Sequence, residues 1–251
     1  DKTMQRESVN QKRGVSARNW IVWLAVLIAA PATLLVAWRF GNRKYYLSSL
    51  LLIVYAMLPF FVRFEHKKPQ ARELVTIAVM SAVAVASRAA FIMVPVFKPL
   101  TGIVMITGMA LGPEAGFLTG AISGFVSNFI FGQGPWTPWQ MFAFCVAGFL
   151  TGVLAKRGWL TAEKRLPAGL FGGICVLILI GPILDTCSLF TMSTEIMAAS
   201  AAGIYLAGLP VNAVHALATF LTVFFLGKPI EEKLDRIKVK YGMMGGDEDE
   251  I

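Results

Sequence analysis

Long apolar runs constrain the fold of this chain more than any other feature. Hydrophobic residues make up 56% of the 251 residues, and the mean hydropathy of +0.65 is far above that of a soluble domain. A membrane-spanning helix needs about 20 mostly apolar residues. The sequence therefore predicts an all-α, polytopic membrane helix bundle. Its eight candidate spans are Trp20–Trp38, Tyr46–Val62, Leu74–Val94, Leu100–Leu111, Ala115–Phe131, Trp139–Ala155, Ala168–Phe190 and Ala199–Leu226.

The positions of Lys and Arg predict how these spans cross the membrane. The fourth span would rise only ~18 Å, so it could instead merge with the fifth into one long helix. Separate spans put 18 of the 23 Lys and Arg on one side and 4 on the other, whereas a merged helix leaves 9 against 13. Cytoplasmic loops are enriched in Lys and Arg. We therefore expect a break at Gly112-Pro113 and both termini in the cytoplasm.

The same pattern divides the chain into four regions. Residues 1–63 form a basic N-terminus with a two-helix transmembrane hairpin, and residues 64–73 form a charged cytoplasmic linker. Residues 74–228 form a six-helix core, and residues 229–251 a charged cytoplasmic tail that begins with a short helix. The core has no internal repeat, which argues against an inverted-repeat secondary transporter.

The segment Gly108–Met141 has the most unusual composition. Its glycines recur every four residues, at 108, 112, 116, 120 and 124, and this spacing lines one face of a helix. Glycine lets another backbone or a ligand come close. The ladder leads into the loop Gly132–Trp139, which the predicted topology makes external. We interpret the ladder as the floor, and the loop as the lid, of an outward-facing pocket.

Polar side chains within the spans, most of them in the outer half, are candidate ligand-binding residues because such groups are costly in a membrane. Residues of the external loop join them. Amide and indole groups together would suit a flat heterocyclic ligand. The candidates are Arg88, Asn128, Gln133, Trp136, Thr137, Trp139, Gln140, Asp185 and Asn212.

Structural roles remain open for several polar residues. Arg88 and Asp185 could pair across the bundle, and the tryptophans could be interfacial anchors. Asn128 and Asn212 could be hydrogen-bond partners between helices. His215 is interpreted as a structural histidine.

Catalytic and metal-binding motifs are missing from the sequence. It contains no GxxxxGK[ST], HExxH or GxSxG pattern. Its cysteines, Cys145, Cys175 and Cys187, lie in apolar runs and are expected to be packing residues. We expect no enzyme activity, no cofactor or metal, and no nucleic-acid partner.

The region from Arg72 to Lys228 resembles the S components of energy-coupling-factor (ECF) vitamin transporters. The resemblance rests on the alanines after ARELVTIAV, on the block FKPLTGIVMITGMALGPEAGFLTGAISGFVSNFIFGQGPWTPWQMFAF, and on the six-helix plan. It implies a prokaryotic cell-membrane protein that captures a vitamin from outside and docks onto a T subunit with two cytosolic ATPases. The resemblance also implies that Ala78, Ala82 and Ala86 contact the T subunit. Ligand-covering loops would be Pro95–Pro99, Gly132–Pro138 and Thr191–Met197.

The identity of the vitamin is less constrained. The glycine-rich block and the WTPW loop look similar to the cobalamin or corrinoid subgroup, so a corrinoid is the expected ligand. Riboflavin, thiamine, queuosine-type and folate ligands would also suit aromatic and amide walls. Two alternatives belong to other classes: an autonomous secondary transporter that uses Asp185 and His215, and a membrane scaffold subunit.

Overall fold

The computed structural model describes residues 45–66, 71–193 and 197–242. The chain divides into two compact units, residues 1–69 and residues 70–251, and each is described by itself. In the first unit, helix α2 (Tyr45–His66) matches the second predicted span. The first predicted span, Trp20–Trp38, lies outside the described residues.

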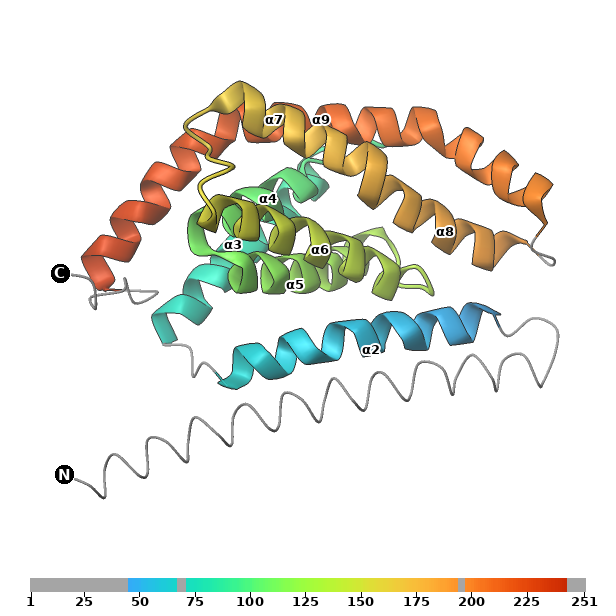
Figure 1. Ribbon diagram of the computed structural model, residues 1–251, viewed down its shortest axis with the longest axis horizontal. Helices are drawn as coiled ribbons and strands as arrows, with labels where there is room; N and C mark the ends of the chain where they lie inside the picture. The colour runs from blue at the N-terminus through green and yellow to red at the C-terminus, as the bar shows by residue number, and fades with distance from the viewer. Residues whose placement is uncertain (1–44, 67–70, 194–196, 243–251) are drawn as a thin grey trace, which may run out of the picture. The chain divides into compact units, whose positions relative to one another are not determined.

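The second unit supplies all the remaining described elements, and they are all helical (Figure 1). The order matches the six predicted core segments, because α7, η1 and α8 form one continuous helix with a π-helical stretch in its middle. The bounds are α3 (Ala71–Ala90), α4 (Leu100–Leu111), α5 (Pro113–Phe131), α6 (Thr137–Lys156), α7 (Arg165–Cys175), η1 (Val176–Ile180), α8 (Gly181–Met192) and α9 (Ala198–Tyr241).

The helices of this unit form a polytopic membrane bundle. Among the described residues, α3, α6, the continuous α7–α8 helix and α9 are long and apolar enough to cross a membrane. Helix α4 is shorter, and all 12 of its residues are buried. It packs against α3, α5, α6 and α9, so its short length is accommodated by surrounding protein.

The predicted break between the fourth and fifth spans is confirmed. Gly112 separates α4 from α5 and has a φ of +92°, which glycine adopts without the steric penalty of a side chain. Pro113 then occupies the first position of α5, where its missing N–H costs no helical hydrogen bond. The two helices therefore form a hairpin.

The glycine ladder is a packing seam, which corrects its interpretation as a pocket floor. A Cβ atom on Gly116 would collide with the carbonyl oxygen of Gly148, and one on Gly120 would lie 2.5 Å from the carbonyl carbon of Phe144. Both obstacles belong to the backbone of α6. Four-residue spacing correctly predicts a small-residue helix face, but that face meets a helix and leaves no room for a ligand.

Two groups of helices make up the unit, α3–α6 and α7–α9, and they meet mainly where α4 contacts α9. Gly102 allows this contact, since a Cβ atom there would lie 2.6 Å from the Cβ of Thr222. Figure 1 shows α7 and α8 running beside α9. A binding site at the junction of the two groups can therefore draw on both.

Helix α9 extends further than predicted. It continues without interruption to Tyr241, so the segment after residue 229 is not a separate short helix. Figure 1 shows the helix bending along its length, and its interior prolines, Pro210 and Pro229, are residues of the kind that bend helices.

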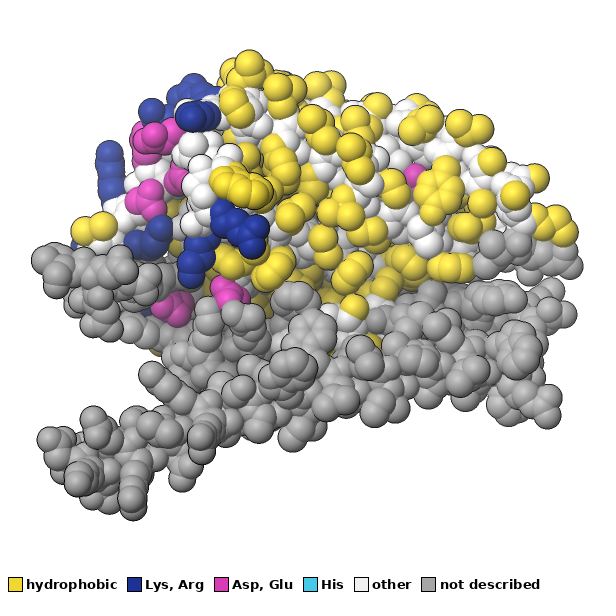
Figure 2. Space-filling model, viewed as in Figure 1, with side chains coloured by type: hydrophobic (Ala, Val, Ile, Leu, Met, Phe, Trp, Pro, Cys, Tyr) yellow, Lys and Arg dark blue, Asp and Glu magenta, His cyan; other side chains and the backbone are white. Residues whose placement is uncertain are grey.

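Charged side chains gather at one end of the second unit, over the C-terminal part of α9 and the start of α7 (Figure 2). Hydrophobic side chains dominate the rest of the face shown. This distribution is what a bundle with one end in the cytoplasm would have. The cytoplasmic assignment of that end remains a prediction.

Candidate functional site

A cavity of about 290 Å³ lies where the two groups of helices meet. Its walls combine aliphatic and aromatic side chains with a few polar groups, as ligand sites commonly do. Five elements and the α3–α4 connection contribute to it. The lining residues are Arg88, Val96, Lys98, Leu100, Thr101, Gln140, Phe144, Leu184, Val211 and His215.

Arg88 enters this region from the last turn of α3 and is buried. Its Nη1 donates hydrogen bonds to Ser127 Oγ at 2.5 Å and to Asn128 Oδ1 at 3.0 Å. Asn128 Nδ2 in turn donates to Thr137 Oγ1 at 3.0 Å and to Gln140 Oε1 at 2.9 Å. Asn128 therefore connects α3 and α5 to the start of α6.

The network continues into the loop between α5 and α6. Thr137 Oγ1 donates to Gln133 Oε1 at 2.9 Å and accepts from the Gly134 N–H at 3.2 Å. Gln133 Nε2 donates back to the Phe125 carbonyl at 3.0 Å. The predicted residues Arg88, Asn128, Gln133, Thr137 and Gln140 thus form one hydrogen-bonded network, and Arg88 and Gln140 from it line the cavity.

The two tryptophans lie outside the cavity wall. Trp136 is exposed, its Nε1 donates to the Gly132 carbonyl at 3.2 Å, and its ring covers Gly134. Trp139 is buried, with its ring centre 5.8 Å from that of Phe190. Trp136 therefore holds its own loop, while Trp139 packs α6 against α8.

Asp185 and Asn212 form a separate pair. Asn212 Nδ2 donates to Asp185 Oδ2 at 2.7 Å and ties α8 to α9. The alternative pairing of Arg88 with Asp185 is not what the structure contains, since each has other hydrogen-bond partners. The neighbouring residues Leu184 and Val211 line the cavity. The hydrogen bond between Asp185 and Asn212 therefore fixes part of the cavity wall in position.

Sequence reasoning missed several residues of the site. Lys98 Nζ lies 4.0 Å from the centre of the Phe131 ring, and Arg88 Cζ lies 4.4 Å from the same centre. Thr101 Oγ1 and His215 Nε2 are 2.8 Å apart. Burial lowers the pKa of the Lys98 ammonium, and the nearby Arg88 charge lowers that pKa further. The available signal was a single lysine between two prolines in a loop predicted to be external.

A strained turn presents Lys98 to the cavity. The Phe97 N–H donates to the Pro95 carbonyl at 2.7 Å, across a Val96 whose φ is +65°. This is a γ-turn of the rare positive-φ type, and a β-branched residue is unfavourable there. Strained backbone of this kind clusters at ligand sites, and both Val96 and Lys98 line the cavity.

The alanine ridge lies on the other side of α3. Ala78, Ala82 and Ala86 are all exposed, whereas Met80, Ala84 and Arg88 are among the buried residues of the same helix. The ridge and the arginine therefore use different faces of one helix.

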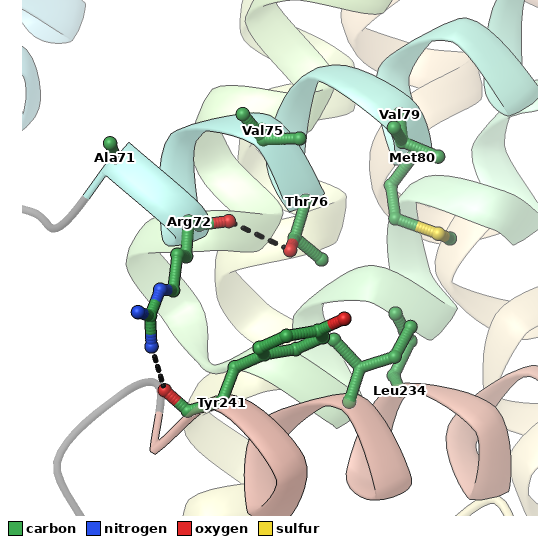
Figure 3. Close-up of a pocket in the computed structure, with 9 residues that line it drawn as sticks. Ala71, Arg72, Val75, Thr76, Val79, Met80, Leu234 and Tyr241 are labelled. Atoms are coloured by element: carbon green, nitrogen blue, oxygen red, sulfur yellow. Dashed lines mark hydrogen bonds between the residues drawn. The ribbon is translucent and has the colours of Figure 1, made fainter.

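A groove of about 470 Å³ lies beside this ridge, between the start of α3 and the C-terminal part of α9 (Figure 3). Val75 and Val79 line the groove, and Thr76 and Met80 of α3 point toward Tyr241 and Leu234 of α9. Arg72 Nη1 donates to the Tyr241 carbonyl at 2.9 Å and joins the two helices at the groove's end. An exposed small-residue ridge thus continues into an apolar groove.

A polytopic helix bundle with such a cavity is typical of membrane proteins that bind a small solute. The sequence model of one family, the ECF-type riboflavin transporter, S component, matches residues 68–232. The chain belongs to this family. No curated protein and no solved structure matches the chain.

Membership confirms the predicted resemblance to ECF S components. The protein is the substrate-binding component of an ECF transporter and a multi-pass membrane protein of prokaryotes. The family implies a vitamin ligand and association with T and ATPase subunits. It is a family of transport components, and the match gives no support to a corrinoid subgroup.

Proposed function

We propose that this chain captures a flavin-class vitamin from outside the cell and delivers it through a T subunit and two ATPases. The family is named for riboflavin. The observation that carries the proposal is the cavity at the junction of the two helix groups. Phe144 and the aliphatic residues around it offer surfaces for a flat ring system, while Gln140 and Thr101 offer hydrogen bonds to ring edges.

Cavity size favours a flavin over the corrinoid expected from the sequence. The volume of about 290 Å³ is at the lower limit of pockets for drug-sized ligands, which run from roughly 300 to 1,000 Å³. A flavin is of that size class. A corrinoid is several times larger and would require the two helix groups to separate.

The partner-binding part of the proposal concerns α3. Its exposed alanines would allow a T-subunit helix to approach closely, because small residues permit close helix packing in lipid. Both termini would be cytoplasmic, which puts the charged end of the core on the ATPase side. The proposal keeps the predicted division of the chain, with α9 continuing from the core into the tail. Its parts are the N-terminal region 1–63, the linker 64–73, the core 74–228 and the tail 229–251.

A ligand screen tests this function. The purified protein is heated with riboflavin, riboflavin 5′-phosphate, thiamine, folate, cobalamin or queuine, and its unfolding is followed. A flavin at a thousandfold excess over its dissociation constant should stabilise the protein by about 4 kcal/mol, and cobalamin should give no shift. Stabilisation by cobalamin, or by neither flavin, would contradict the proposal.

A further inference from the structure

The titratable groups that line the cavity are all basic. They are Arg88, Lys98 and His215. Arg88 and Lys98 contact the same Phe131 ring, at 4.4 and 4.0 Å from its centre. No Asp or Glu is among the lining residues. The polar side of the site is therefore cationic.

Within the described part of the chain, these two cations have no acidic partner. The hydrogen-bond acceptors of Arg88 are the neutral oxygens of Ser127 and Asn128. Asp185 lies beside the lining residue Leu184, but its Oδ2 accepts from Asn212. The cation–π contacts of Arg88 and Lys98 with the Phe131 ring offset part of the cost of burying the two charges. The ring supplies no negative charge.

Uncompensated cations in a membrane-embedded cavity are costly, and an anionic ligand group would remove that cost. Arginine suits a phosphate because its planar N–H groups can bind two oxygens at once. The Arg88 guanidinium has five N–H donors. Its hydrogen bonds to Ser127 and Asn128 occupy two of them if each bond uses one hydrogen. Lys98 adds a point charge on a loop, where a phosphate at the edge of the cavity could reach it.

We infer that the captured flavin carries a phosphate ester, held between Arg88 and Lys98, and that riboflavin 5′-phosphate binds more tightly than riboflavin. The inference rests on the proposed flavin function and names the form of the ligand. The isoalloxazine ring would face the Phe144 side of the cavity. The phosphate, with about −1.5 to −2 charges near pH 7, would neutralise the cationic side.

Flavin fluorescence titrations test this inference on the purified full-length protein. Riboflavin 5′-phosphate should bind at least about tenfold more tightly than riboflavin at low ionic strength, as expected for charge-assisted hydrogen bonds. Lys98→Met should remove most of this difference, because the phosphate would lose its ion pair with the Lys98 ammonium. Lys98→Arg should keep the difference. Lys164→Met is the matched control, because Lys164 is exposed and outside the cavity.

The possible failures are distinguishable. If wild-type protein binds riboflavin as tightly as its phosphate, or more tightly, the phosphate inference is overturned and the flavin function stands. A preference for the phosphate that survives intact in Lys98→Met would also overturn it. If neither flavin binds, the proposed function itself fails. The wild-type ratio can overturn the inference without any variant, so a variant that fails to fold does not leave it untested.

Discussion

Asn128 connects the cationic side of the cavity to the loop between α5 and α6. It accepts from Arg88 Nη1 and donates to Thr137 and Gln140, and its side chain is fully buried. One amide therefore positions a charged group and a neutral group that both line the cavity. Loss of this residue would affect the site without removing any cavity-lining side chain.

Replacing Asn128 with leucine should destabilise the protein and weaken flavin binding. The substitution preserves approximate size but leaves Arg88, Thr137 and Gln140 each without one partner. We expect a loss of about 1–3 kcal/mol in the free energy of unfolding, measured by detergent-induced unfolding, together with weaker flavin binding. Ser188→Ala is the control, since in the described part of the chain the Ser188 hydroxyl donates to the Leu184 carbonyl of its own helix. Unchanged stability in Asn128→Leu would contradict the role assigned to this amide.

At the residue scale, sequence reasoning identified the network but missed half of the cationic site. Arg88 and Asn128 were recognisable because polar residues within apolar spans stand out. Lys98 was included only through the predicted ligand-covering loop Pro95–Pro99 and not as a candidate residue, because its contact with Phe131 spans 33 positions of the chain and follows from a γ-turn. The composition of its loop suggests that Trp136 contacts the ligand, which stays a prediction; in the structure its ring covers Gly134 of the same loop.

Among the helices, the seam between α5 and α6 controls the shape of the site. Gly120 meets the backbone of Phe144, and Phe144 and Gln140 of α6 line the cavity. Anything that moves α6 away from α5 must therefore move part of the cavity wall. Backbone atoms cannot rotate away as a flexible side chain can.

Gly120→Ala should destabilise the protein and reduce flavin affinity together. The added methyl group would lie 2.5 Å from backbone atoms of Phe144, and overpacking of this kind costs about 1–3 kcal/mol. Gly203→Ala is a matched control on α9, where a Cβ atom meets nothing within 4 Å. That change should be neutral, or stabilising by up to about 1 kcal/mol. Equal melting temperatures for the two variants would refute the packing role of Gly120.

The sequence predicted helix bounds correctly where local signals were strong. It could not predict which segment packs against a given helix face. Apolar length and the Gly112-Pro113 pair predicted the α4–α5 hairpin correctly. The four-residue glycine spacing predicted a close-packing face but could not say what packs there, since the same pattern serves a helix or a ligand. The charge change after residue 228 predicted a helix end that does not exist, because α9 continues through Pro229.

For the whole core unit, the cavity-lining face of α3 and its proposed partner-contact face lie on different sides of the helix. Arg88 faces the cavity from the buried side of this helix, and Ala82 lies on the exposed side. The sequence already contained this division, because residues six positions apart on a helix point in substantially different directions. It did not contain the junction between the two helix groups, which depends on contacts such as Gly102 with Thr222.

Because of this separation, Ala82→Leu should block assembly and spare ligand binding. A leucine on the ridge would hold a T-subunit helix away from α3, while the cavity on the other face would keep its shape. Co-purification with a T subunit and its ATPases should fall sharply, and flavin affinity should stay within about twofold, a difference of about 0.4 kcal/mol. Ala207→Leu makes the same change at an exposed position of α9 and should leave assembly intact. If Ala82→Leu assembles normally, or loses flavin binding instead, the proposal that one face of α3 contacts the T subunit and the other lines the ligand cavity is wrong.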